Sequence, residues 1–192
     1  MPHCCQAVWA AADVSGAHFN PAITLALAIT GDGFRLGDTL PYTFAQMAGA
    51  SLASVALSGL LGIGQAPGMP GAFRSEVLLT AALAFGAFGV GEWARRGVVR
   101  ERSSPALIGS WVGALSYSFG HLRAGLNPAV SFGPRAAAAV LGGGAAALGG
   151  ARAYLLGPCI GGVLGGMMLA TCRVGVDAAA ALDSFTPRSL AR

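Results

Sequence analysis

The chain has 192 residues, of which 54% are hydrophobic and 10% are charged, and its mean hydropathy is +0.63. These values exclude an ordinary soluble globular domain and favour a membrane protein. All twelve basic residues are arginines, giving a formal net charge of +4. Because they cluster between apolar stretches, we expect the lipid bilayer and not nucleic acid as the partner.

The first distinctive segment is a box of Asn20, Pro21 and Ala22. No signal peptide is predicted before it, since Met1 to Ala12 has no basic segment followed by a sustained apolar core. Asparagine is a favoured N-cap, and proline fits the first helical position. The box therefore predicts the start of a helix over Ile23 to Thr30, which is too short to cross a bilayer and is expected to span half of it.

Three apolar stretches follow and predict full membrane crossings: Tyr42 to Gly64, Val77 to Gly91 and Pro105 to Phe119. The Gly- and Pro-rich segment Gly62 to Gly71 separates the first two and is expected to be an extracellular loop. Four arginines between Arg95 and Arg102 separate the last two. The positive-inside rule places those arginines in the cytoplasm.

A second box, Asn127, Pro128 and Ala129, repeats the first and precedes another short apolar run, Val130 to Leu141. The three crossings between the boxes are an odd number, so the two half-helices should enter from opposite faces and meet head to head. Gly142 to Gly150 is the expected loop after this run. The repeat predicts two related halves of one all-α membrane domain.

The fourth predicted crossing is Tyr154 to Cys172, and its glycines, Gly157, Gly161 and Gly165, lie four residues apart, which favours close helix packing in lipid. We expect Gly49, with Ala45, Ala48 and Ser51, to pack similarly. The predicted boundaries are a membrane domain over residues 1–176 and a disordered cytoplasmic tail over 177–192. The four cysteines lack metal-ligand spacing, so no metal or cofactor is expected, and no catalytic constellation is found.

The paired boxes resemble those of the aquaporins and aquaglyceroporins, the major intrinsic protein family. The resemblance runs from about Ser15 to Thr171 and includes Gln46, Glu76 and the Leu156-Gly157-Pro158 run. It implies a helical bundle with two re-entrant half-helices, a homotetramer and a passive channel for water or small neutral solutes such as glycerol. Family members carry a complete helix and most of a second before the first box, whereas nineteen residues precede Asn20. We therefore expect a fold lacking the first helix and part of the second.

The resemblance also implies roles for individual residues. The two asparagine amides would meet the solute at the pore centre, and Val130 takes the place of the usual filter arginine. Ala124 and Ser116 correspond to neighbouring filter positions, although the latter could equally be Leu115. Glu76 is expected to anchor a re-entrant loop. Two family markers, Ser131 and Tyr154, are similar to those of water channels, whereas Arg135 is similar to that of glycerol channels.

Several alternatives remain open at this point. The boxes could be simple helix caps, Glu76 an ordinary interfacial residue, and Val130 a lipid-facing side chain. His18 could line the pore, although a hydrogen-bonded structural role in the first loop is favoured. At the level of function, the alternatives are a non-conducting channel homologue with a structural or assembly role, and a secondary transporter. The scarcity of charged residues within the crossings argues against the transporter.

Overall fold

The computed structural model describes residues 2–31, 33–61, 72–122 and 124–185. Within these residues the regular structure is entirely helical. Short helical turns connect the longer helices. They are η1 (Leu36–Asp38), η2 (Glu101–Ser103), η3 (Gly120–Leu122), η4 (Ala139–Gly143) and η5 (Gly144–Leu148). The longer helices are α1 (Pro2–Ser15), α2 (Pro21–Thr30), α3 (Thr39–Leu61), α4 (Ala72–Arg95), α5 (Ser104–Phe119), α6 (Pro128–Ala138) and α7 (Ala151–Phe185).

Three of the described helical segments are long and apolar enough to cross a membrane: Leu36–Leu60, Phe73–Arg95 and Ala151–Asp177. They agree with three of the four predicted crossings. The fourth, Pro105 to Phe119, is not among them, because α5 has 16 residues and a crossing helix needs about 20. The turn η3 follows α5 directly and continues its path.

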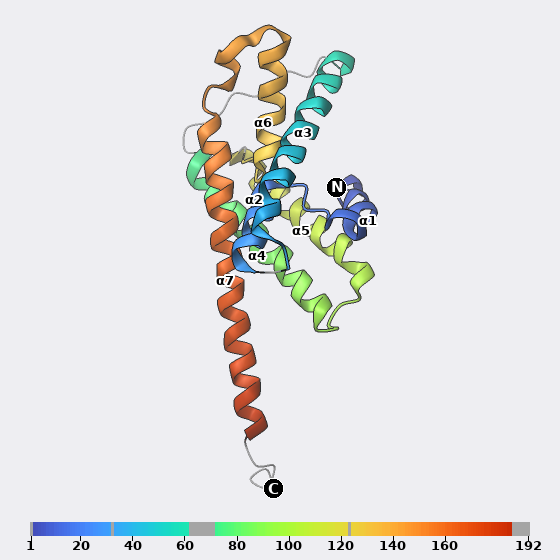
Figure 1. Cartoon of the computed structure of the whole chain (residues 1–192), viewed down its shortest axis with the longest axis vertical. Helices are drawn as coiled ribbons and strands as arrows, with labels where there is room; N and C mark the ends of the chain where they lie inside the picture. Colours follow the sequence, from blue (N-terminus) through green and yellow to red (C-terminus); the bar gives the residue numbers. More distant parts are fainter. Residues whose placement is uncertain (1, 32, 62–71, 123, 186–192) are drawn as a thin grey trace.

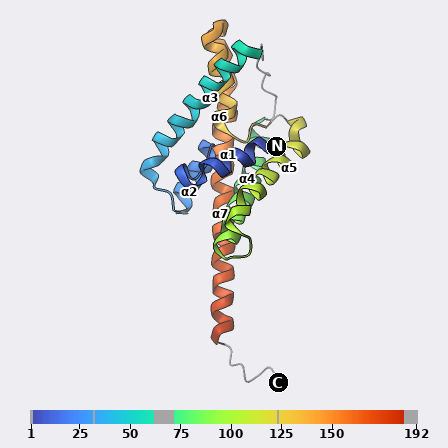
Figure 2. The same ribbon diagram turned by 90° about the vertical axis from the view of Figure 1, so that its right-hand side faces the viewer.

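The longest packed surface joins α4 to α7, which lie side by side (Figures 1 and 2). Gly157 approaches Glu76, Gly161 approaches Val77 and Gly165 approaches Ala81, so the two helices run parallel. A Cβ atom at any of these glycines would collide with α4. The predicted role of the glycines in close helix packing is therefore confirmed.

A second row of glycines on α7 receives α2, a feature that the sequence analysis missed. Gly162 approaches the backbone of Ala22, and Gly166 approaches Thr30. The half-helix α2 therefore packs along α7 and runs in the same sense. The other half-helix, α6, packs against α3.

The close approach predicted at Gly49 of α3 is not made at that residue within the part of the chain that the structure describes. Gly49 has nothing within 4 Å of a Cβ atom built on it, whereas a Cβ atom on Gly133 of α6 would meet the backbone of Ala50. The small residue that permits the close approach of α3 and α6 is therefore Gly133, on the half-helix.

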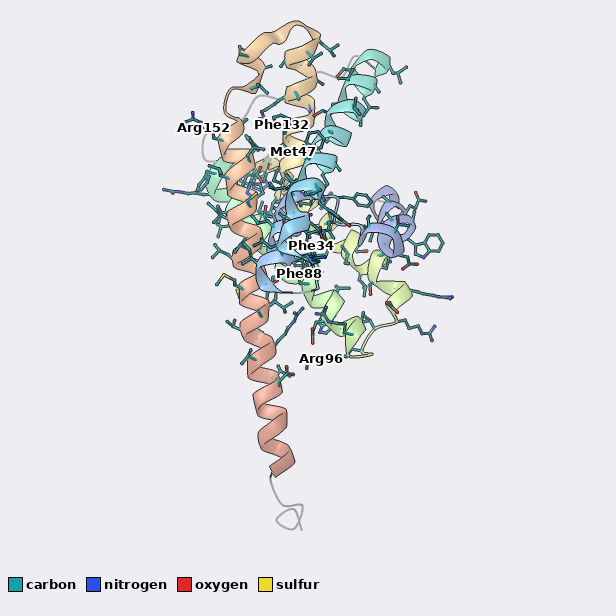
Figure 3. The ribbon with its side chains drawn as sticks, viewed as in Figure 1. Phe34, Met47, Phe88, Arg96, Phe132 and Arg152 are labelled. Atoms are coloured by element: carbon teal, nitrogen blue, oxygen red, sulfur yellow. The ribbon has the colours of Figure 1, made fainter. Side chains whose placement is uncertain are left out.

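The C-terminal end of α4 is tied to α7 by ion pairs. The Glu92 carboxylate pairs with Arg95 and Arg96, which follow it closely in the sequence. It also pairs with Arg173 of α7 at 3.0 Å. Arg96 also reaches Asp177 of α7 at 3.0 Å, and Figure 3 shows it beside the lower part of that helix. These ion pairs join the segment that begins with Arg95 and Arg96, predicted to be cytoplasmic, to α7 near Arg173 and Asp177.

The structure differs from the predicted start of the C-terminal tail, and one predicted loop falls outside the described residues. Helix α7 continues to Phe185, so residues 177–185 are helical where a disordered tail was expected. Residues 178–181 are alanines, which favour the helical conformation, and this explains why the helix continues beyond Asp177. The expected loop Gly62 to Gly71 and residues 186–192 lie outside the described residues.

Candidate functional site

The two boxes start the half-helices, as their capping signals predict. The Asn20 side-chain oxygen accepts a hydrogen bond from the Ala22 amide at 2.9 Å. The Asn127 side-chain oxygen accepts from the Ala129 amide at 2.9 Å and from the Val130 amide at 3.5 Å. With 10 and 11 residues, α2 and α6 are each about 15 Å long, half the thickness of the hydrocarbon core.

The N-terminal ends of the half-helices meet through a reciprocal pair of hydrogen bonds. The Asn20 side-chain nitrogen donates to the Leu126 carbonyl at 2.8 Å, and the Asn127 side-chain nitrogen donates to the Phe19 carbonyl at 2.8 Å. Each asparagine therefore contacts the residue that precedes the other asparagine. The half-helices meet head to head, and Figure 1 shows α6 extending from this point toward the end where α3 finishes.

Backbone strain accompanies this arrangement. Phe19 and Leu126 both have a positive φ, 48° and 55°, in the left-handed region that costs a non-glycine residue roughly 1 kcal/mol or more. Both residues place their carbonyl oxygen against the opposite asparagine. The strain is thus stored where the loops expose their acceptors.

The asparagine side chains keep a donor in reserve. A side-chain amide has two N–H donors, and the inter-loop bond uses one of them on each asparagine. The second can donate to another oxygen atom at this point. The positive ends of two helix dipoles also point at the meeting point, so the site favours oxygen acceptors and disfavours cations.

The loop before α2, here called the first loop (residues 16–19), is fastened by uncharged groups. The buried Thr24 hydroxyl donates its one proton to the Asn20 carbonyl at 3.1 Å. It must therefore accept from the Gln46 side-chain nitrogen at 3.0 Å and from His18 Nδ1 at 3.1 Å. This assigns the His18 proton to Nδ1 and gives the residue a structural place, which is the role favoured from the sequence.

Two aromatic rings pack against His18. The ring centroids of Phe34 and Tyr42 lie 4.8 Å and 5.4 Å from that of the imidazole, and Phe34 is labelled in Figure 3. These contacts hold the imidazole within the first loop.

The loop before α6, here called the second loop (residues 124–126), is fastened by a carboxylate. The Glu76 side chain on α4 is completely buried, and its two oxygens accept hydrogen bonds from the Gly125 amide at 2.5 Å and the Leu126 amide at 2.9 Å. This geometry is that of a loop anchor and not of an exposed interfacial residue. Arg123, which belongs to the same segment, lies outside the described residues.

The three candidate filter residues have different surroundings. Val130, on the first turn of α6, is 58% exposed, and Ser116 on α5 is also exposed. Ala124 is half-buried and packs against a leucine cluster of Leu79, Leu83, Leu115 and Leu126. Ala124 therefore contributes to the packing of the second loop. The side chains of Val130 and Ser116 are exposed.

The chain is similar in sequence to known proteins. The family model described as major intrinsic protein matches residues 3–169. The chain is 32% identical over 177 residues to the probable aquaporin TIP2-1 of Oryza sativa subsp. japonica, covering 86% of this chain and 66% of that protein. It is 32% identical over 184 residues to the glycerol uptake facilitator protein of Bacillus subtilis (strain 168), covering 84% of this chain and 65% of that protein. The chain thus spans slightly less than two thirds of the length of these curated relatives.

A solved structure supports the fold. The aquaglyceroporin from Plasmodium falciparum superposes with a TM-score of 0.70, covering 83% of this chain and 74% of that chain at 24% sequence identity. This likeness establishes the helical fold and carries no conclusion about the transported molecule.

Proposed function

We propose that this chain, which belongs to the major intrinsic protein family, is a passive membrane channel for water or small neutral solutes such as glycerol. It is an integral membrane protein with several helices able to cross a bilayer. The observation that carries the proposal is the reciprocal bonding of Asn20 and Asn127 across the meeting point of the half-helices. The relatives include proteins named for water and for glycerol, so both solutes are candidates.

The composition of the filter favours solutes larger than water. Val130 supplies no hydrogen-bond donor and no positive charge at the position where the family usually has an arginine with five donors. Its exposed side chain leaves room for methylene groups and interacts with them favourably. We therefore infer that glycerol passes in addition to water, with Val130, Ser116 and Ala124 near the narrowest part of the path.

Osmotic swelling of proteoliposomes tests the proposal. Vesicles containing the full chain should pass water and glycerol faster than protein-free vesicles of the same lipid. The matched variant is Asn127→Asp, which keeps an N-cap acceptor but removes both amide donors and adds a negative charge. It should insert normally and lose most of the flux. Equal flux in wild-type and protein-free vesicles would instead identify a non-conducting homologue.

The filter assignment has its own variant. Val130→Arg restores a bulky cation with fixed donors, so glycerol permeability should fall more than water permeability. An unchanged ratio of the two permeabilities would show that the residue 130 side chain lies outside the path.

The assembly and its orientation belong to the same proposal. A homotetramer follows from the family resemblance, and chemical cross-linking in native membranes should trap species up to four chains. The arginines from Arg95 to Arg102 should face the cytoplasm. A thiol introduced at the exposed Val98 should therefore react only when the reagent has access to the inner face.

A further inference from the structure

We propose that the connection between α4 and α5, residues 96–103, forms with the last turn of α4 a binding surface for the headgroups of anionic phospholipids. Three observations support it: the level at which α4 and α7 leave the bilayer, two arginines that have no acidic partner, and an exposed tryptophan beside them. The surface requires only that the chain spans a membrane, so it is independent of the proposed channel function.

The connection lies at the level of the lipid headgroups. The candidate spans of α4 and α7 end at Arg95 and Asp177. These two ends are level with each other, because Arg96, the residue after the first span, pairs with Asp177 at 3.0 Å. Figure 3 shows Arg96 beside α7 at this point. Since the headgroup region begins where the hydrocarbon core ends, the residues that follow Arg95 face lipid phosphates.

The acidic groups at the ends of α4 and α7 are already engaged by arginines. The Glu92 carboxylate pairs with Arg95, Arg96 and Arg173, and the Asp177 carboxylate pairs with Arg96. These two carboxylates therefore offset part of the positive charge of the three arginines that surround them.

Two further arginines in the connection keep their charge available. Arg100 and Arg102 are exposed, and neither forms an ion pair within the part of the chain that the structure describes. Glu101 lies between them in the sequence and offsets one charge of the two. A guanidinium donates to two phosphate oxygens at once, and arginines directly beside a membrane span attract anionic lipids.

An exposed tryptophan favours a lipid over a soluble anion. Trp93, on the last turn of α4, is 53% exposed. The Val98 amide donates to the Trp93 carbonyl at 2.8 Å, and Gly97, with a φ of 70°, makes the turn. The connection therefore folds back beside Trp93. Tryptophan is typical of the membrane interface. A phospholipid offers its phosphate to the arginines and its glycerol and acyl groups to this ring, whereas a free phosphate offers only the first contact.

A pair of charge-matched variants tests the surface. Arg100→Gln combined with Arg102→Gln removes the two arginines that lack an ion pair, so this variant should unfold at the same temperature as wild type. The control combines Arg74→Gln with Arg152→Gln. It removes two exposed arginines near the opposite ends of the same helices, α4 and α7, and thus changes the net charge equally.

Native mass spectrometry of the full chain in detergent measures the binding of single lipid molecules. Titration with phosphatidylglycerol and with phosphatidylcholine should show that wild type binds the anionic lipid more tightly. The Arg100→Gln, Arg102→Gln variant should bind phosphatidylglycerol on the order of tenfold more weakly, with phosphatidylcholine binding unchanged. The control should bind phosphatidylglycerol as wild type does.

Three results would overturn the surface. They are equal affinities of wild type for the two lipids, equal weakening in the two variants, and displacement of bound phosphatidylglycerol by inorganic phosphate, which would identify a site for soluble anions. Osmotic flux separates this inference from the proposed function. Selective loss of phosphatidylglycerol binding in a protein whose wild type shows no flux would support the surface and contradict the channel. Normal flux with unchanged lipid binding in the variant would do the reverse.

Discussion

The two loops that carry the Asn-Pro-Ala boxes reach the same geometry by different chemistry. Phe19 and Leu126 are equivalent by the repeat, share a positive φ and offer their carbonyl to the opposite asparagine. Their support differs: neutral hydrogen bonds centred on Thr24 hold the first loop, and the Glu76 carboxylate holds the second. The features that the two loops share lie where the half-helices meet. The two loops thus have the same geometry at this point, although different interactions hold each loop in place.

The largest expected effect comes from the different burial of the two strained residues. Leu126 is 6% exposed within a leucine cluster, and Phe19 is 46% exposed. Glycine relieves the backbone strain at both positions. Leu126→Gly also empties a buried site, so we expect a net loss of about 3 kcal/mol in the free energy of unfolding, whereas Phe19→Gly should be close to neutral. Unfolding in mixed micelles measures both, and equal losses would mean that the two loops are packed alike.

A smaller effect is expected from the neutral fastening of the first loop. Thr24→Val removes the hydroxyl that accepts from His18 and Gln46, leaving two donors without this acceptor. The expected loss is about 2 kcal/mol. Thr24→Ser keeps the hydroxyl and is the matched control, which should retain most of the stability. A Thr24→Val protein as stable as the serine variant would show that the network contributes little.

The boxes show which parts of the site the sequence can predict. Capping by Asn20 and Asn127 depends on residues within three positions, and a proline at the first helical position reinforces it, so local rules suffice. The head-to-head meeting followed from counting crossings. In contrast, two contacts join separate helices and are indicated by no local sequence pattern. Arg135 lies over the Tyr154 ring, and the Gln46 side-chain nitrogen donates a hydrogen bond to the Thr24 hydroxyl.

The fold shows the same division. Apolar length predicted α3, α4 and α7, and the four-residue spacing of glycines predicted the packing of α7 on α4. The second glycine row, Gly162 and Gly166, was missed because the partner, α2, is brought there only by the tertiary fold. Helix α1 lies before the first box, where the sequence analysis expected the remaining part of a second helix without giving its bounds. Helix α5 coincides with the third predicted stretch to within one residue, and the turns η2 and η3 adjoin its two ends.

The distance between the Asn127 side-chain nitrogen and the Phe19 carbonyl carbon tests the central claim most directly. Asn20 and Asn127 are the only asparagines in the chain, so ¹⁵N-asparagine labelling reports on the two boxes alone. In a sample that also carries ¹³C-carbonyl phenylalanine, Phe19 is the one phenylalanine bonded to an asparagine nitrogen. For the full chain in lipid bilayers, solid-state dipolar recoupling should give about 4 Å, as a hydrogen bond to this carbonyl requires. A distance beyond about 6 Å, which no hydrogen bond spans, would contradict a shared meeting point of the two half-helices.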